Sequence, residues 1–167
     1  IRESDPKLMI AYTFDFNEDA SKTRSNMGDY MYLKDGSLYQ TNITSQFVDV
    51  VFKYAGYSLM AEYASRNAEN PVALEDDGTS TGDIVLTGNA FNVAMGYFIS
   101  NKVELAGRWT SVTYQEITGS SPVSMYTLGL NKFIVGHKLK IQSDLSYAQR
   151  NGTEDELVFR TGFELHF

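Results

Sequence analysis

The side chains that could do chemistry in this chain are charged groups that recur at alternate positions within apolar stretches. Alternation places successive side chains of a strand on opposite faces, so we expect these groups to share one face of a sheet. Acids and bases are nearly balanced among them, which favours a wall of ion pairs over a ladder of one sign. The set is Asp15, Asp49, Lys53, Glu62, Arg66, Glu104, Arg108, Lys140, Asp144, Arg160 and Glu164, with His166 beside it. A basic track for anions, formed by the lysines and arginines of this set, is the sharper alternative.

Other kinds of chemistry have little support in the sequence. The absence of Cys excludes disulfides, thiolate zinc sites, iron–sulfur clusters and thiol catalysis. The two histidines, His137 and His166, have no spacing to carboxylates that would make a metal site. Serine nucleophile motifs and glycine-rich phosphate loops are also absent. We therefore expect no catalytic residue, no metal ligand and no cofactor, and the chain is predicted not to be an enzyme.

One acidic loop contains carboxylates of the kind that bind calcium. The segment 69–83 contains Glu75-Asp76-Asp77-Gly78, but it lacks the alternating oxygen ligands and the closing Glu of a calcium-binding loop. A solvated loop is the expectation, and a weak calcium site is the alternative.

Composition excludes several classes of protein. The 167 residues are 43% hydrophobic and 13% aromatic, which is too apolar for a disordered segment. A net charge of −7 argues against nucleic acid as a partner, because such binding needs clustered cations. No apolar stretch reaches the length that a transmembrane helix needs. The first six residues show no initiating Met and no leader pattern, so we expect a mature or cut chain.

Period-two alternation recurs eight times and predicts eight strands. The predicted strands are 7–17, 47–54, 57–66, 91–99, 103–110, 126–134, 139–147 and 157–167. Tight turns around Gly56, Asn101 and Gly136-His137 alternate with long polar loops at 18–45, 67–83, 116–122 and 149–156. Long loops and short turns therefore lie at opposite ends of the sheet, and both termini fall at the short-turn end.

Aromatic residues are frequent in the apolar rows, where their rings would suit the headgroup level of a membrane. These girdle candidates are Tyr12, Tyr54, Tyr57, Tyr63, Tyr97, Trp109, Tyr126, Tyr147 and Phe167. With the strand length and the loop pattern, they predict one all-β domain over residues 1–167, a transmembrane antiparallel up-and-down β-barrel. A soluble barrel or sandwich with its apolar face inward is the alternative.

Three segments carry a resemblance to a known family. The stretches 96–109, 126–133 and 140–147 resemble the closing strands of the phosphate-selective porin O and P family of outer-membrane porins, in its Bacteroidetes-like form. The ending Phe163-Glu164-Leu165-His166-Phe167 is similar to the C-terminal signal that delivers such barrels to the outer-membrane assembly machinery. The resemblance implies a sixteen-stranded barrel, commonly a homotrimer, of which this chain is the C-terminal half.

We therefore expect a protein of the bacterial outer membrane, in contact with its lipid. The expected function is passive diffusion of small hydrophilic solutes, with anions such as phosphate among the candidates. The alternative is a non-conducting structural or interaction barrel within a larger outer-membrane complex, because eight strands can close with side chains filling the interior.

Overall fold

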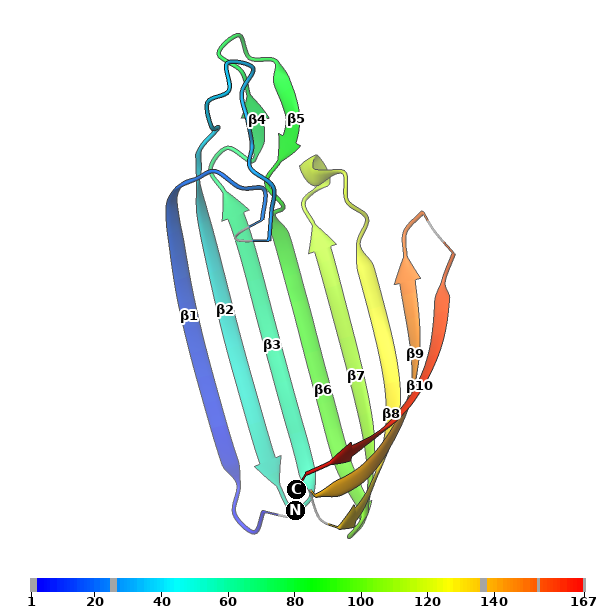
Figure 1. Ribbon diagram of the computed structural model, residues 1–167. Helices are drawn as coiled ribbons and strands as arrows, with labels where there is room; N and C mark the ends of the chain where they lie inside the picture. Colours follow the sequence, from blue (N-terminus) through cyan, green and yellow to red (C-terminus); the bar gives the residue numbers. More distant parts are fainter. Residues whose placement is uncertain (1–2, 25–26, 136–137, 153, 167) are drawn as a thin grey trace.

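The computed structural model describes residues 3–24, 27–135, 138–152 and 154–166, and most of them lie in strands (Figure 1). Eight strands form one antiparallel up-and-down sheet in the order β1-β2-β3-β6-β7-β8-β9-β10. They are β1 (Lys7–Ala20), β2 (Thr41–Tyr54), β3 (Tyr57–Ala68), β6 (Gly88–Ser100), β7 (Val103–Tyr114), β8 (Val123–Val135), β9 (Leu139–Arg150) and β10 (Glu156–Leu165). None of the helices in the described residues is long and apolar enough to cross a membrane.

The all-β fold and the eight strands predicted from alternation are confirmed. Most strands extend further toward the long-loop end than the apolar pattern reached, since β2 begins at Thr41 and β6 at Gly88. A small hairpin of β4 (Val72–Leu74) and β5 (Ser80–Ile84) was not predicted, because strands of three and five residues are too short to show a period. The tight turn expected at 136–137 lies outside the described residues.

The described strands do not form a closed barrel, as Figure 1 shows. β1 pairs only with β2, and β10 pairs only with β9. The alternating pattern reports which side chains share a face, but it carries no information on whether the first and last strands meet. The coarser prediction, an antiparallel up-and-down sheet, holds, and the closed eight-stranded form is not present.

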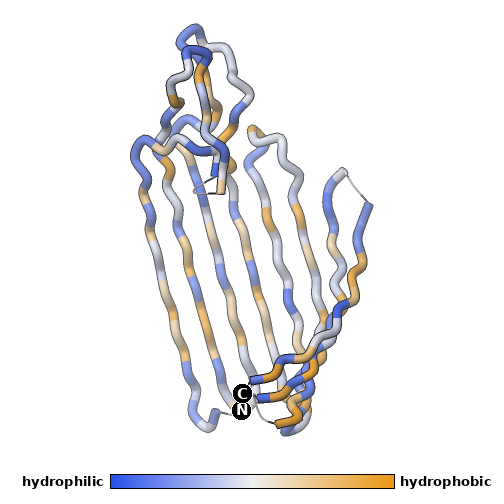
Figure 2. Tube along the Cα trace, viewed as in Figure 1, coloured by the Kyte–Doolittle hydropathy of each residue, from blue (hydrophilic) through white to orange (hydrophobic). Residues whose placement is uncertain are grey.

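The register of the sheet separates two faces. One row of directly paired residues crosses all eight strands and is apolar throughout: Ile10, Val50, Ala61, Val93, Trp109, Tyr126, Tyr147 and Leu157. The next row on that face is Leu8, Phe52, Leu59, Met95, Gly107, Leu128, Leu145 and Phe159. We call this the apolar face and the opposite one the polar face. Figure 2 shows hydrophobic and hydrophilic segments alternating along the strands, and loops above the sheet that contain both kinds.

The sheet curves so that the polar face is the inner one. Ser45, Gly96 and Ser146 on that face are buried by their neighbours. On the apolar face, Leu128 is 60% exposed and Phe159 67% exposed. A soluble barrel would enclose most of its large apolar side chains. This sheet carries most of them on the outer face, while Phe98 and Phe133 on the inner face are buried and lie with their ring centroids 5.3 Å apart.

The main buried hydrophobic cluster lies in the loops above the sheet. Met31, Ala73 and Val85 are completely buried there and pack with Ile43 at the start of β2. We call residues 21–24, 27–40 and 69–87 the loop cap. Main-chain bonds hold its parts together, among them Leu86 N to Thr23 O at 2.9 Å and Val85 N to Pro71 O at 2.7 Å. The two longest loops therefore fold as one unit with its own core.

Shortening Met31 should loosen the loop cap and leave the sheet intact. We expect Met31→Ala to cost about 2 to 5 kcal/mol of local stability, because it removes a fully buried side chain and leaves a cavity. Amide hydrogen exchange at Tyr39 and Val85, whose N–H groups donate to cap carbonyls, measures the effect. Met27→Ala is the matched control, since Met27 is on the same loop and 85% exposed. Equal exchange in both variants would contradict a cap held by its own core.

Candidate functional site on the polar face

All the charged residues that the alternation selected lie on the polar face. Cross-strand pairing places Asp49 opposite Glu62, Asp144 opposite Arg160 and Lys140 opposite Glu164, and the rest of the set falls into the same rows or adjacent rows of this face. The aromatic candidates Tyr12, Tyr54, Tyr57, Tyr63, Tyr97, Trp109, Tyr126 and Tyr147 lie on the apolar face. Phe167, the remaining girdle candidate, lies outside the described residues.

Among the residues that the structure describes, the ion pairs between strands of this face are confined to one side of it. Arg160 donates from Nε at 3.0 Å and from its terminal nitrogen at 2.7 Å to Asp144 Oδ1, and Lys140 Nζ lies 2.6 Å from Glu164 Oε2. At 2.5 Å, His166 Nε2 approaches the other oxygen of Glu164. These pairs gather on β9 and β10, so the predicted wall of ion pairs is present at one side of the sheet.

On the first three strands, Lys7 at the start of β1 pairs with Glu3 at 2.7 Å, and the other charged residues that the structure describes there form no ion pair. Among the described residues Arg66 forms no ion pair, and its Nε reaches only Ser45 Oγ at 3.4 Å. Asp49 and Glu62 face each other as like charges, and the Glu62 carboxylate accepts a bond from Asn92 Nδ2 at 2.5 Å.

Amide and hydroxyl groups join neighbouring strands in series of hydrogen bonds that were not predicted from the charged residues. In the first series, Thr110 donates to Asn92, which donates to Glu62, so these hydrogen bonds connect β7, β6 and β3. A second series runs from Gln142 through Asn131 to Glu104, across β9, β8 and β7. The sequence held a signal for these groups, because they occupy the same alternate positions as the charged residues.

A third network surrounds the Asp144–Arg160 pair. Ser146 Oγ lies 2.8 Å from Thr127 Oγ1 and donates to Asp144 at 3.2 Å, while Arg160 donates to Ser146 at 2.8 Å. Beside it, a recess of about 460 Å³ lies over small residues, and its polar lining includes Arg108, Asn131, Gln142, Asp144 and Arg160. Ala106, Gly129 and Gly162 provide its floor. The arrangement can hold water and small polar solutes by hydrogen bonds, and no cluster of potential metal ligands occurs among the described residues.

The apolar face carries two levels of aromatic rings. Near the long loops, Tyr63 packs on Phe91 with ring centroids 4.7 Å apart, and Phe91 stacks with Trp109 at 6.3 Å. Near the short turns, Tyr57 stacks on Tyr97 at 4.3 Å. Tyr63 follows Tyr57 by six positions on β3, so the two levels are roughly 20 Å apart at about 3.3 Å per residue.

Two matching turns form the tips of the loop cap. In one, Asp35 accepts bonds from the hydroxyl and the main-chain N–H of Ser37, and in the other Asp77 accepts the same two bonds from Thr79. These hydrogen bonds stabilise the charged carboxylates, with the hydroxyl bond the larger cause, and lower the pKa of Asp35 and of Asp77. The acidic loop predicted to be solvated is thus part of a folded cap.

The cap tips should loosen under acid conditions. A carboxylate whose pKa is depressed by folding stabilises the fold above its unfolded pKa, and this contribution is lost as the pH falls through the folded pKa. We expect the amide resonances of Ser37 and Thr79 to titrate together with midpoints below the ordinary aspartate value, as measured by NMR. In Asp77→Asn the Thr79 titration should vanish and that of Ser37 should persist. A midpoint at or above the ordinary value would contradict the bonded carboxylates.

The fold and the polar face define an all-β protein whose curved sheet is polar inside and apolar outside. Comparisons with family models, with curated proteins and with solved structures found no match to this chain.

Proposed function

We propose that this chain is a segment of an outer-membrane porin barrel, which lets small hydrophilic solutes diffuse across the bacterial outer membrane. The observation that carries the proposal is the exposure of continuous apolar rows on the outer face of a sheet whose inner face is polar. In water such a surface is costly at about 25 cal/mol per Å², while in lipid it is the matching surface.

The aromatic levels support a membrane setting. Transmembrane barrels carry an apolar band about 25 Å tall between two girdles of aromatic residues. Between the levels of Tyr57 and Tyr63, one row contains large apolar side chains such as Leu59, Met95 and Leu128. The next row contains the aromatic residues Trp109, Tyr126 and Tyr147. A spacing of roughly 20 Å between the two levels of rings fits such a band.

The open edges favour completion of the barrel by further strands. An unpaired strand edge in lipid leaves backbone groups unsatisfied, which costs several kcal/mol per group. β1 and β10 run antiparallel to each other, because eight strands alternate in direction. Any even number of additional strands can therefore close the sheet with antiparallel pairing throughout. The resemblance to the porin O and P family favours eight more strands, assembly through the C-terminal strand and a trimer.

A non-conducting structural barrel is the second candidate. The hydrogen-bonded chains that cross β3 to β10 on the polar face would serve it as well, because they fix the register of the wall whether or not solutes pass. Conductance separates the two functions.

The facing of the strands can be tested with two adjacent residues of β3. Leu59 lies on the apolar face and Met60 on the polar face, and both are near the middle of the proposed band. We expect Leu59→Arg to destabilise the lipid-inserted protein by about 2 to 4 kcal/mol, and Met60→Arg to cost much less. Denaturant titration of protein refolded into vesicles measures both. Equal costs would contradict the assignment of the apolar face to lipid.

Conductance of the protein as extracted from membranes tests the pore itself. In a planar bilayer we expect ohmic channels, and Asp144→Asn should shift the reversal potential in a salt gradient toward anion preference. The reason is that Arg108 and Arg160 lose the carboxylate that lies among them. Asp77→Asn, at a cap tip, is the matched control and should change the selectivity little. Absence of channels would favour the structural barrel.

A further inference from the structure

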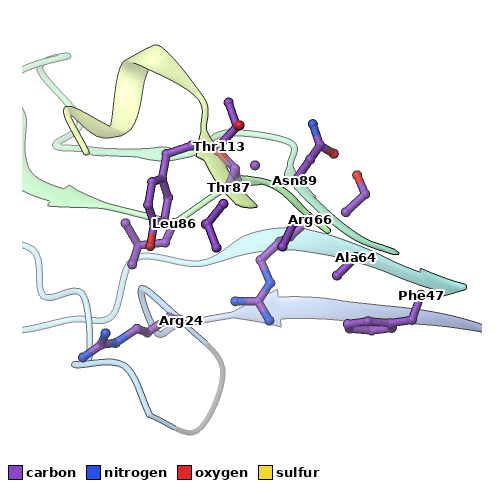
Figure 3. Close-up of a pocket in the computed structure, with 13 residues that line it drawn as sticks. Arg24, Phe47, Ala64, Arg66, Leu86, Thr87, Asn89 and Thr113 are labelled. Atoms are coloured by element: carbon purple, nitrogen blue, oxygen red, sulfur yellow. The ribbon is translucent and has the colours of Figure 1, made fainter. Parts of the chain in front are cut away.

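A second hollow of the polar face lies at its long-loop end, beneath the loop cap. Its volume is about 290 Å³, and Figure 3 shows Arg66 in its wall between Leu86 and Ala64, with Arg24 further out on the loop. Strand residues from β2, β3, β6 and β7 form its lower part, and residues of the cap form its upper part. The cavity therefore depends on both folded units of the molecule.

Small residues create this cavity. Ala64, Gly88 and Ala90 occupy neighbouring positions on β3 and β6. A Cβ at Gly88 would meet the main-chain oxygen of Thr113 at 2.2 Å, so no larger residue fits there. The bond from Leu86 N to Thr23 O keeps the cap above the hollow. The space is thus a consequence of the packing of strands and cap.

The lining combines a cation with apolar groups. The two charged residues among those that line it are arginines, Arg24 and Arg66, and none of the lining residues is acidic. Arg66 is partly buried and forms no ion pair within the described ranges, while Phe47, Leu86 and Val112 contribute apolar surface. Arg66 also lines a neighbouring hollow together with Asp15, Asp19 and Lys22, so its positive charge is shared between that hollow and this cavity.

We infer that this cavity binds a small organic anion, namely a carboxylate carried on a compact apolar body such as an aromatic ring. The guanidinium of Arg66 matches the planar carboxylate group, since its N–H donors form a fork of the same geometry. The apolar walls cover the ring, and a cavity near 300 Å³ is at the small end of ligand sites. The inference rests on the proposed function, because it names a solute class for the face proposed to line the pore.

Binding of benzoate to the full chain in detergent micelles, measured by equilibrium dialysis, tests this inference. We expect saturable binding at one site, with acetate and benzyl alcohol binding at least tenfold more weakly, because each lacks one half of the recognised group. Tighter binding of inorganic phosphate than of benzoate would overturn the inference, since the apolar lining would then contribute nothing.

Variants identify the site. Arg66→Gln should weaken benzoate binding at least tenfold, Arg66→Lys less, and Ala90→Leu at least tenfold because it fills the space and leaves the arginine in place. Arg150→Gln is the matched control, since Arg150 is an exposed arginine of the same face outside the cavity. Circular dichroism checks the strand content of each variant. Unchanged binding in Arg66→Gln, or no benzoate binding by the unmodified chain, would overturn the inference.

The same preparation separates this inference from the proposed function. Specific benzoate binding by a protein that forms no channels would refute the proposed porin function and support the proposed binding cavity. Channels formed by a protein that binds no benzoate would support the porin function and refute the binding cavity.

Discussion

The antiparallel register of the eight long strands determines which side chains share a face and which lie next to one another. In a pleated strand, neighbouring residues point to opposite faces, so a shift of one residue would exchange the faces of a whole strand. The register here aligns apolar residues across all eight strands, from Ile10 on β1 to Leu157 on β10. The same alignment builds the polar face, because the residues that alternate with the apolar ones along each strand are brought together on the opposite side of the sheet.

The two faces of the sheet differ in the size of their side chains. Small residues on the inner face, such as Gly96 and Gly129, let the sheet curve and let longer polar side chains lie across neighbouring strands. At Gly96 an added Cβ would come within 2.5 Å of Glu104 Oε1, so that carboxylate occupies the space a side chain would need. Glu104 is thereby placed to accept its bond from Asn131. The small residues of the inner face thus allow both the curvature of the sheet and the hydrogen bonds between its polar side chains.

The loop cap adds a second, independent source of order. Its core of Met31, Ala73 and Val85 lies above the sheet and is closed from below by Ile43 of β2, with Ala20 and Ala68 at the ends of β1 and β3 packed against it. At its lower edge it meets Arg66 and the small residues of β3 and β6, where the cavity forms. A rim built in this way holds charged groups at fixed positions near the opening of the proposed pore.

The strands, the order of long and short connections and the face of nearly every side chain are predictable from the sequence, because alternation is a local property of the extended backbone. The alternation therefore predicted the shared face of Asp144 and Arg160 and the opposite face of Trp109. Which face is the inner one follows from long-range packing, because a strand with either face turned inward has the same period in its sequence. Long-range packing also determines that β1 and β10 stay apart, that β4 and β5 fold into a cap, and that Arg66 lies in a cavity, since these depend on contacts between residues distant in the chain.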